Sequence, residues 1–126
     1  MARAVLEGVA FAIREHLDTM AQAGVPITEI RVSGGGARSA LWNRIKANIS
    51  GIPILSVASD ATSLGVALVA GTAIGIYPSL ADAVERCVHI AQRFDPDCGV
   101  RALYDERYTR FRALARANSE APAPTA

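Results

Sequence analysis

The side chains best suited to chemistry surround a run of three consecutive glycines at residues 34–36. Ala37, Arg38 and Ser39 follow directly, so a small residue, a cation and a hydroxyl come straight after the glycines. Glycine accepts positive φ angles and carries no Cβ, so a ligand can approach its backbone closely. A helix that starts just after such a turn also presents free amide groups and the positive end of its dipole. This chemistry suits a phosphate, or a nucleobase or ribose lying on bare backbone, although a purely structural turn would use the same glycines.

Two common glycine motifs do not account for this segment. The P-loop places Gly-Lys-Ser/Thr after four intervening residues, whereas the first lysine after these glycines is Lys46. The dinucleotide-binding fingerprint is met by Gly34 and Gly36, but Ser39 stands where its third glycine belongs. The acidic residue expected at the end of the next strand is also displaced, since Asp60 comes too late. A Rossmann-like dinucleotide binder is therefore an alternative with partial motif support.

The other reactive side chains form no recognisable catalytic or metal-binding set. His16 lies among charged residues and His89 on the polar side of a predicted helix, so both are expected to be solvated. The serines beside the glycines have no partnered histidine to activate them. Cys87 and Cys98 lack metal-ligand spacing and are too few for a disulfide framework, so free thiols are expected. We therefore assign no catalytic and no metal-ligating residue.

Hydrophobic periodicity places the glycines between a strand and a helix. In chain order, the pattern predicts a helix over residues 3–23, a strand over 27–32, a helix over about 38–50, a strand over 54–57 and a helix over 60–75. A further helix is predicted to start after the N-cap Ser79 and to carry apolar residues as far as Ala91. The last predicted helix spans about 99–117 and has a basic, solvated face. The apolar face of the first helix is formed by Val5, Leu6, Val9, Ile13, Leu17 and Met20. Two short strands rarely make a stable sheet alone, so the sheet is expected to continue in missing sequence or in a partner chain.

Composition excludes several classes of protein. The chain has 126 residues, a net charge of +1 and 51% apolar residues, which is typical of one soluble globular domain. The nearly neutral charge argues against a nucleic-acid surface. No apolar run approaches the roughly 18 residues that a membrane-spanning helix needs, and no secretory signal peptide is recognised. We therefore expect a cytoplasmic protein that binds neither nucleic acid nor membrane.

Three blocks of sequence resemble the C-terminal domain of the FGGY-family carbohydrate kinases, the xylulokinase-like members above all. They are Arg-Ala-Val-Leu-Glu-Gly-Val-Ala-Phe-Ala at residues 3–12, Gly-Gly-Gly-Ala-Arg-Ser at residues 34–39 and Ala-Thr-Ser-Leu-Gly-Val-Ala at residues 61–67. The similarity extends to about residue 114. It implies an α/β fold, namely part of an actin-like (ribonuclease H-like) ATPase domain that is mostly helical with two short strands. Residues 1–117 would form this portion of the domain, and residues 118–126 a disordered tail.

The resemblance also implies a site and its ligands. Nucleotide-binding residues would be Gly34, Gly35, Gly36 and Ala37, which line the adenosine part, with Arg38 and Ser39 at its edge. The small-residue helix over residues 62–75 would support this site from beside it. ATP would be the phosphate donor, Mg²⁺ is expected in the full-length enzyme, and the acceptor would be a sugar such as a pentulose or polyol.

The chain departs from the family pattern in two ways. Arg44 and Asn48 stand where family members commonly carry glutamine and aspartate. The family's sugar-binding residues, catalytic-base aspartate and first phosphate loop lie N-terminal to the resembling stretch, and none is present. We therefore expect a nucleotide-binding portion that is inactive without the N-terminal sugar-binding domain. Its partners would be ATP or ADP and either that domain or a second copy. The alternative is a non-catalytic interaction or oligomerisation module that uses its apolar faces.

Overall fold

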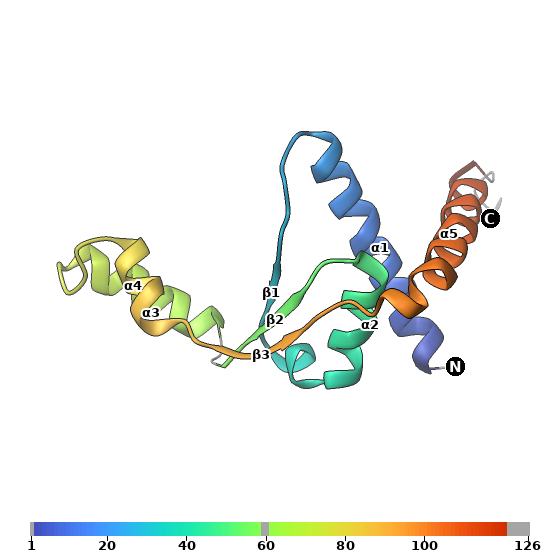
Figure 1. Ribbon diagram of the computed structural model, residues 1–126. Coiled ribbons are helices and arrows are strands. Elements are labelled where there is room, and N and C mark those ends of the chain that lie inside the picture. The colour runs from blue at the N-terminus through green and yellow to red at the C-terminus, as the bar shows by residue number, and fades with distance from the viewer. Residues whose placement is uncertain (1, 59–60, 121–126) are drawn as a thin grey trace, which may run out of the picture.

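The computed structural model describes residues 2–58 and 61–120, which form a mostly helical α/β fold (Figure 1). Its elements, in chain order, are α1 (Ala2–Gln22), β1 (Ile30–Val32), the 3-10 helix η1 (Gly35–Arg38), α2 (Ala40–Ser50), β2 (Ile54–Val57), α3 (Ala61–Ala73), α4 (Leu80–Cys87), β3 (Ile90–Phe94), the 3-10 helix η2 (Cys98–Val100) and α5 (Arg101–Glu120). Helix α5 passes residue 117, where the predicted domain portion ends. The rest of the predicted disordered tail, residues 121–126, lies outside the described residues.

The sheet has one strand more than the sequence predicted. Its order is β1-β2-β3, with β1 parallel to β2 and β3 antiparallel to β2. The prediction of a helix that reaches Ala91 is wrong, because α4 ends at Cys87 and the chain then pairs Phe94 with Ile54. Apolar residues keep a helical spacing across this boundary, whereas β3 buries only Phe94 and so has no alternating pattern.

Helix α2 lies at the centre of the fold and packs on both sides. One side joins a cluster from α1 and α5, made of Ala10, Phe11, Ile45, Ile49, Tyr104 and Tyr108. The other side places Ala47 against Ile54 and Phe94 of the sheet. Because β1, α2 and β2 are consecutive, they form a β-α-β unit that brings the ends of both parallel strands to one edge of the sheet.

A charged network on α1 and α5 surrounds the aromatic cluster. The Glu7 carboxylate accepts hydrogen bonds from Arg3 Nε at 3.0 Å, Tyr104 Oη at 3.1 Å and Arg107 at 3.2 Å. Burial alone would raise the pKa of Glu7, but these hydrogen bonds and the nearby arginine charges outweigh it and hold the pKa below its usual value. Ion pairs also occupy the basic face of α5: Arg101 with Asp105, Arg107 with Glu7, Arg110 with Glu106 and Arg112 with Glu15.

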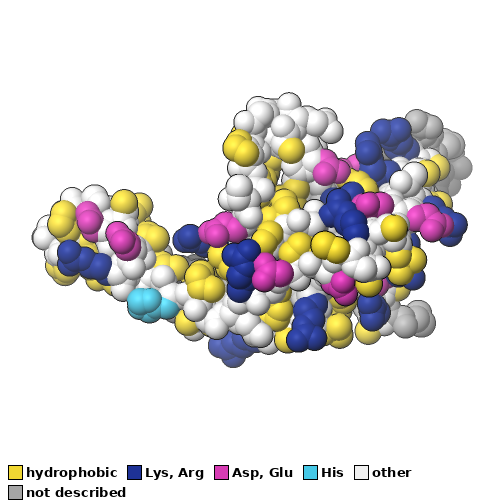
Figure 2. Space-filling view, viewed as in Figure 1, with side chains coloured by type: hydrophobic (Ala, Val, Ile, Leu, Met, Phe, Trp, Pro, Cys, Tyr) yellow, Lys and Arg dark blue, Asp and Glu magenta, His cyan; other side chains and the backbone are white. Residues whose placement is uncertain are grey.

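Helices α3 and α4 form a separate lobe at one end of the molecule (Figure 1). Gly71 of α3 lies close to the segment that connects the two helices, since a Cβ on this glycine would lie 2.9 Å from Cε2 of Tyr77. Figure 2 shows apolar side chains on this lobe beside charged ones. Val66, Val69, Ile74 and Ile76 are each more than half exposed. The predicted apolar face of α1 is likewise only partly buried, since Val5 and Val9 are exposed.

None of the described helices is both long enough and apolar enough to cross a membrane.

Candidate functional site

The three-glycine segment forms a tight turn between β1 and α2. Gly34 has φ 78° and ψ −168°, a conformation that essentially only glycine adopts. The amide of Ala37 donates to the carbonyl of Gly34 at 3.1 Å, which closes η1 directly after the strand. The hydroxyl of Ser39 accepts from the amide of Trp42 at 3.3 Å and caps the start of α2. The sequence therefore builds a strand, a glycine turn and a helix without a linker between them.

Two side chains of α2, Asn43 and Trp42, contact this turn directly. Nδ2 of the fully buried Asn43 donates to the carbonyl of Ala37 at 2.7 Å. Trp42 lies under Gly36, because a Cβ on that glycine would stand 3.6 Å from Cδ1 and Nε1 of the indole. Lys46 places its ammonium 5.2 Å from the centre of the same indole, and burial lowers the pKa of this lysine. The turn is thus fixed to the helix that packs at the centre of the fold.

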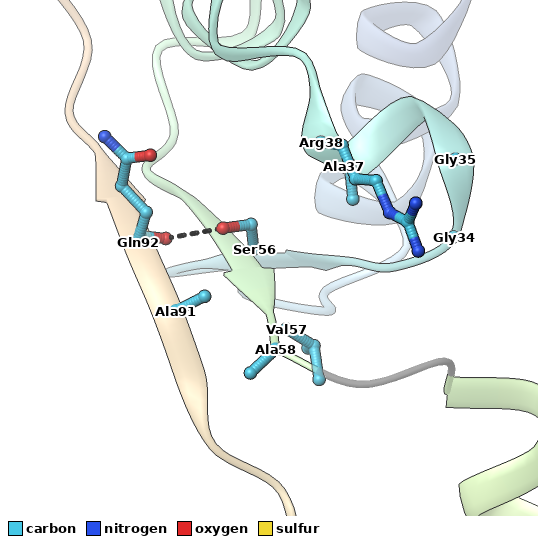
Figure 3. Close-up of a pocket in the computed structure, with 9 residues that line it drawn as sticks. All are labelled: Gly34, Gly35, Ala37, Arg38, Ser56, Val57, Ala58, Ala91 and Gln92. Atoms are coloured by element: carbon cyan, nitrogen blue, oxygen red, sulfur yellow. Dashed lines mark hydrogen bonds between the residues drawn. The ribbon is translucent and has the colours of Figure 1, made fainter.

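A cavity of about 460 Å³ opens beside the turn (Figure 3). Its lining residues come from the turn, the end of β2 and the edge strand β3: Gly34, Gly35, Ala37, Arg38, Ser56, Val57, Ala58, Ala91 and Gln92. The Ser56 hydroxyl donates to the carbonyl of Gln92 at 3.2 Å and ties the two strand walls together. The cavity lies at the carboxyl ends of two parallel strands, which is where α/β sheets commonly bind ligands.

The structure places four of the six predicted site residues at this cavity. Gly34, Gly35, Ala37 and Arg38 line it, whereas Gly36 lies against Trp42 and Ser39 caps α2. No described residue of α3 lines the cavity, although the resemblance placed this helix beside the glycines.

Sequence reasoning found the glycine turn but missed the two other walls of the cavity, the end of β2 and strand β3. The end of β2, at Val57 and Ala58, follows from the parallel pairing of β1 and β2, which would have placed both strand ends at one edge. Ala91 and Gln92 could not be found, because the strand that carries them was predicted as helix.

The charge of the lining is simple. Arg38 is the one ionisable side chain among the described lining residues, and the others offer small apolar groups, bare backbone or neutral polar groups. No cluster of three or more potential metal ligands occurs among the described residues. His16 and His89 are exposed and lie outside the lining, Cys98 is exposed, and Cys87 lies 3.4 Å from the Tyr77 hydroxyl. Such a lining suits a flat neutral group with an anionic end.

Solved structures of sugar kinases share this fold. The xylulose kinase of Rhodospirillum rubrum matches with a TM-score of 0.78 and 31% identity, over 91% of this chain and 24% of that chain. A ligand-bound xylulose kinase of Lactobacillus acidophilus matches with a TM-score of 0.86 over 96% of this chain and 25% of that chain. Its 21% identity shows the fold alone. The fold is therefore that of part of the actin-like ATPase domain of carbohydrate kinases.

Sequence comparison then gives the family. Residues 1–74 match the FGGY family of carbohydrate kinases, C-terminal domain, and the chain belongs to this family. The autoinducer-2 kinase of Yersinia enterocolitica is 33% identical over 114 residues, which are 89% of this chain and 22% of that protein. The predicted family resemblance and fold class are thus confirmed. The chain spans about a fifth of the length of the curated relatives that it matches.

Proposed function

We propose that this chain is the nucleotide-binding portion of an ATP-dependent sugar kinase and that the cavity beside the glycine turn binds the nucleotide. The observation that carries this proposal is a cavity of about 460 Å³ with a glycine turn as one wall. This volume lies within the range of about 300 to 1,000 Å³ that is usual for small-molecule sites. Membership of a kinase family supplies the class of ligand, ATP or ADP.

The walls fit an adenosine better than a free sugar. Ala37, Val57, Ala58 and Ala91 present methyl and isopropyl groups, which suit the face of a base and not a ring of hydroxyl groups. Gly34 and Gly35 leave backbone uncovered, so a ribose or base can approach it closely. In this proposal Gly36 and Ser39 act indirectly, by fixing the turn to α2.

Phosphoryl transfer needs more than this cavity provides. It requires positioned phosphates, a metal ion and an oriented acceptor hydroxyl. The described lining residues include no carboxylate, so by themselves they do not fit a Mg²⁺ ion. We propose that the catalytic groups and any metal ligands come from the rest of a complete kinase, and that this chain alone is inactive. Because relatives include kinases named for xylulose and autoinducer-2, a pentulose or related polyol is the proposed acceptor class.

A cavity-filling variant tests the nucleotide site. Ala91 lines the cavity, and Figure 3 shows its methyl group directed toward Val57 and Ala58. Ala91→Leu should fill this space and weaken ADP binding, measured by calorimetry, by more than about tenfold. Ala81→Leu, on the exposed side of α4, makes the same change away from the cavity and should bind ADP as the wild type does. Unchanged ADP binding by Ala91→Leu would place the nucleotide elsewhere, and uptake of NAD in the same titration would favour the dinucleotide-binding alternative.

Activity of the isolated chain is a separate test. ATP and a series of pentuloses and polyols are mixed with the chain, and ADP release is measured. No sugar-dependent release is expected. Sugar-dependent turnover would contradict the proposal that catalysis needs the rest of the kinase.

A second candidate function rests on the exposed apolar side chains. Val66 and Val69 on α3 are 69% and 58% exposed, and Val5 on α1 is 67% exposed. Exposed apolar side chains commonly take part in interfaces, so the α3 and α1 faces would bind the rest of a kinase or a second copy of the chain. Light scattering of the wild type and of a Val66→Glu, Val69→Glu double variant tests the second possibility. Self-association that the double variant loses would support it, and a monomeric wild type would exclude it.

A further inference from the structure

Arg38 differs from most arginines of the described chain in having no carboxylate partner there. The arginines that do form ion pairs within 4.0 Å are Arg3, Arg14, Arg31, Arg93, Arg101, Arg107, Arg110 and Arg112. Arg38 is exposed, and none of the described residues forms a hydrogen bond or ion pair with its guanidinium group. Its positive charge is therefore available to a ligand.

The same side chain is the one charged group among the described residues that line the cavity. Figure 3 shows Arg38 turned toward the Gly34 end of the turn, where the backbone carries no side chains. Opposite it lie the apolar groups of Val57, Ala58 and Ala91. The cavity is thus polarised, with a cation at the turn and a neutral apolar wall at the strand ends.

We propose that Arg38 binds the phosphate groups of the nucleotide in this cavity, while the base and ribose lie against the apolar wall. Guanidinium groups bind phosphate through two parallel hydrogen bonds, which gives both affinity and orientation. An arginine already paired with a carboxylate would have to break that pair first, and Arg38 has none to break among the described residues. The inference rests on the proposed nucleotide site and adds that Arg38 is the side chain that holds the phosphate groups there.

This arrangement has a measurable consequence for selectivity. A hydrogen bond to a charged group is worth enough to change affinity by about tenfold or more. ADP should therefore bind at least about tenfold more tightly than adenosine, with AMP between the two or equal to ADP. The difference should shrink at high salt, because the site is open to solvent and its charge is screened there. Adenosine binding should be insensitive to salt.

The test uses calorimetric titrations of the chain with adenosine, AMP and ADP in the absence of metal ions. Arg38→Gln should remove the preference for ADP and leave adenosine affinity unchanged, whereas Arg38→Lys should keep part of the preference. Arg44→Gln is the matched control, because Arg44 is also exposed, has no ion pair among the described residues and lies outside the cavity lining. It should retain the full preference for ADP.

The outcomes separate this inference from the proposed function. If the wild type binds ADP no more tightly than adenosine, and Arg38→Gln also shows no difference between the two ligands, the nucleotide site stands and the role of Arg38 is refuted. If Arg44→Gln loses the ADP preference as fully as Arg38→Gln does, the effect is one of general charge and the specific contact is refuted. If the wild type binds neither ligand, both the proposed function and this inference fail.

Discussion

Two adjacent glycines of the turn should respond in opposite ways to the same substitution. Gly34 has φ 78° and ψ −168°, whereas Gly35 does not have a positive φ. A Cβ added at either position meets no heavy atom within 4 Å, so steric contact does not distinguish them. The backbone conformation is the difference that remains between Gly34→Ala and Gly35→Ala.

The magnitude follows from that conformation. A residue other than glycine held in the region of Gly34 costs about 1 to 3 kcal/mol. Replacing a glycine by alanine at a compatible position instead stabilises a protein by about 0.4 to 1 kcal/mol, because the unfolded chain loses freedom. Gly34→Ala should therefore be less stable than wild type by about 1 to 2 kcal/mol, and Gly35→Ala equal to it or slightly more stable.

Urea unfolding measures the difference. Trp42 is the chain's single tryptophan and lies under the turn, so its fluorescence reports on this region, and circular dichroism reports on the helices. With a urea dependence of about 1 to 3 kcal/mol/M, the two midpoints should differ by roughly 1 M. Equal midpoints for the two variants, or a lower midpoint for Gly35→Ala, would refute the argument from φ and ψ.

Three further predictions concern the groups that hold the fold and the turn. Asn43→Ala should destabilise the chain by about 1 to 3 kcal/mol and weaken ADP binding, because the buried carbonyl of Ala37 loses its donor; urea unfolding and calorimetry check both effects. Glu7→Gln should cost about 1 kcal/mol at pH 7, since the pKa of Glu7 is lowered in the folded chain. The stability from Glu7 is present above its unfolded pKa of 4.5 and is lost as pH falls through the folded value, so the deficit of the variant should disappear in urea titrations at acid pH. Burial and a hydrogen bond to Asp18 raise the pKa of Tyr108 to about 12, so stability should fall as pH rises from 10 toward 12, and Tyr108→Phe should lose less over that range; equal pH profiles would contradict this.

The sequence predicts local structure well where one helix face or one turn determines it. The breaks at Gly51 and Pro53 and the apolar spacing of Ile45 and Ile49 predict α2 almost to its ends, whereas its cap at Ser39 is known from the structure alone. The glycine run likewise predicts a strand-to-helix turn, because its residue types suit few other conformations.

The rest depends on contacts that are distant in sequence. Strand β3 forms because its backbone pairs with β2 about 36 residues earlier, and its side chains, apart from Phe94, are exposed. The exposure of Val5 and Val9 was also unpredictable, since an apolar helix face indicates burial but not which neighbour is present to cover it. For the same reason the sequence identified the turn wall of the cavity and missed the wall formed by β3.

The edge position of β3 makes the cavity dependent on a part of the fold that can open locally. The turn and β2 are close in sequence and are anchored by the central helix, whereas β3 is an edge strand that buries a single side chain. Segments with little buried surface open at a lower free energy than the global unfolding of a domain. A ligand that contacts both Ala37 and Ala91 binds only the closed form, in which β3 is paired. Such a ligand therefore shifts the equilibrium of local opening toward the closed form. Binding of a ligand in the cavity should therefore slow amide hydrogen exchange in β3, because both depend on the same opening equilibrium.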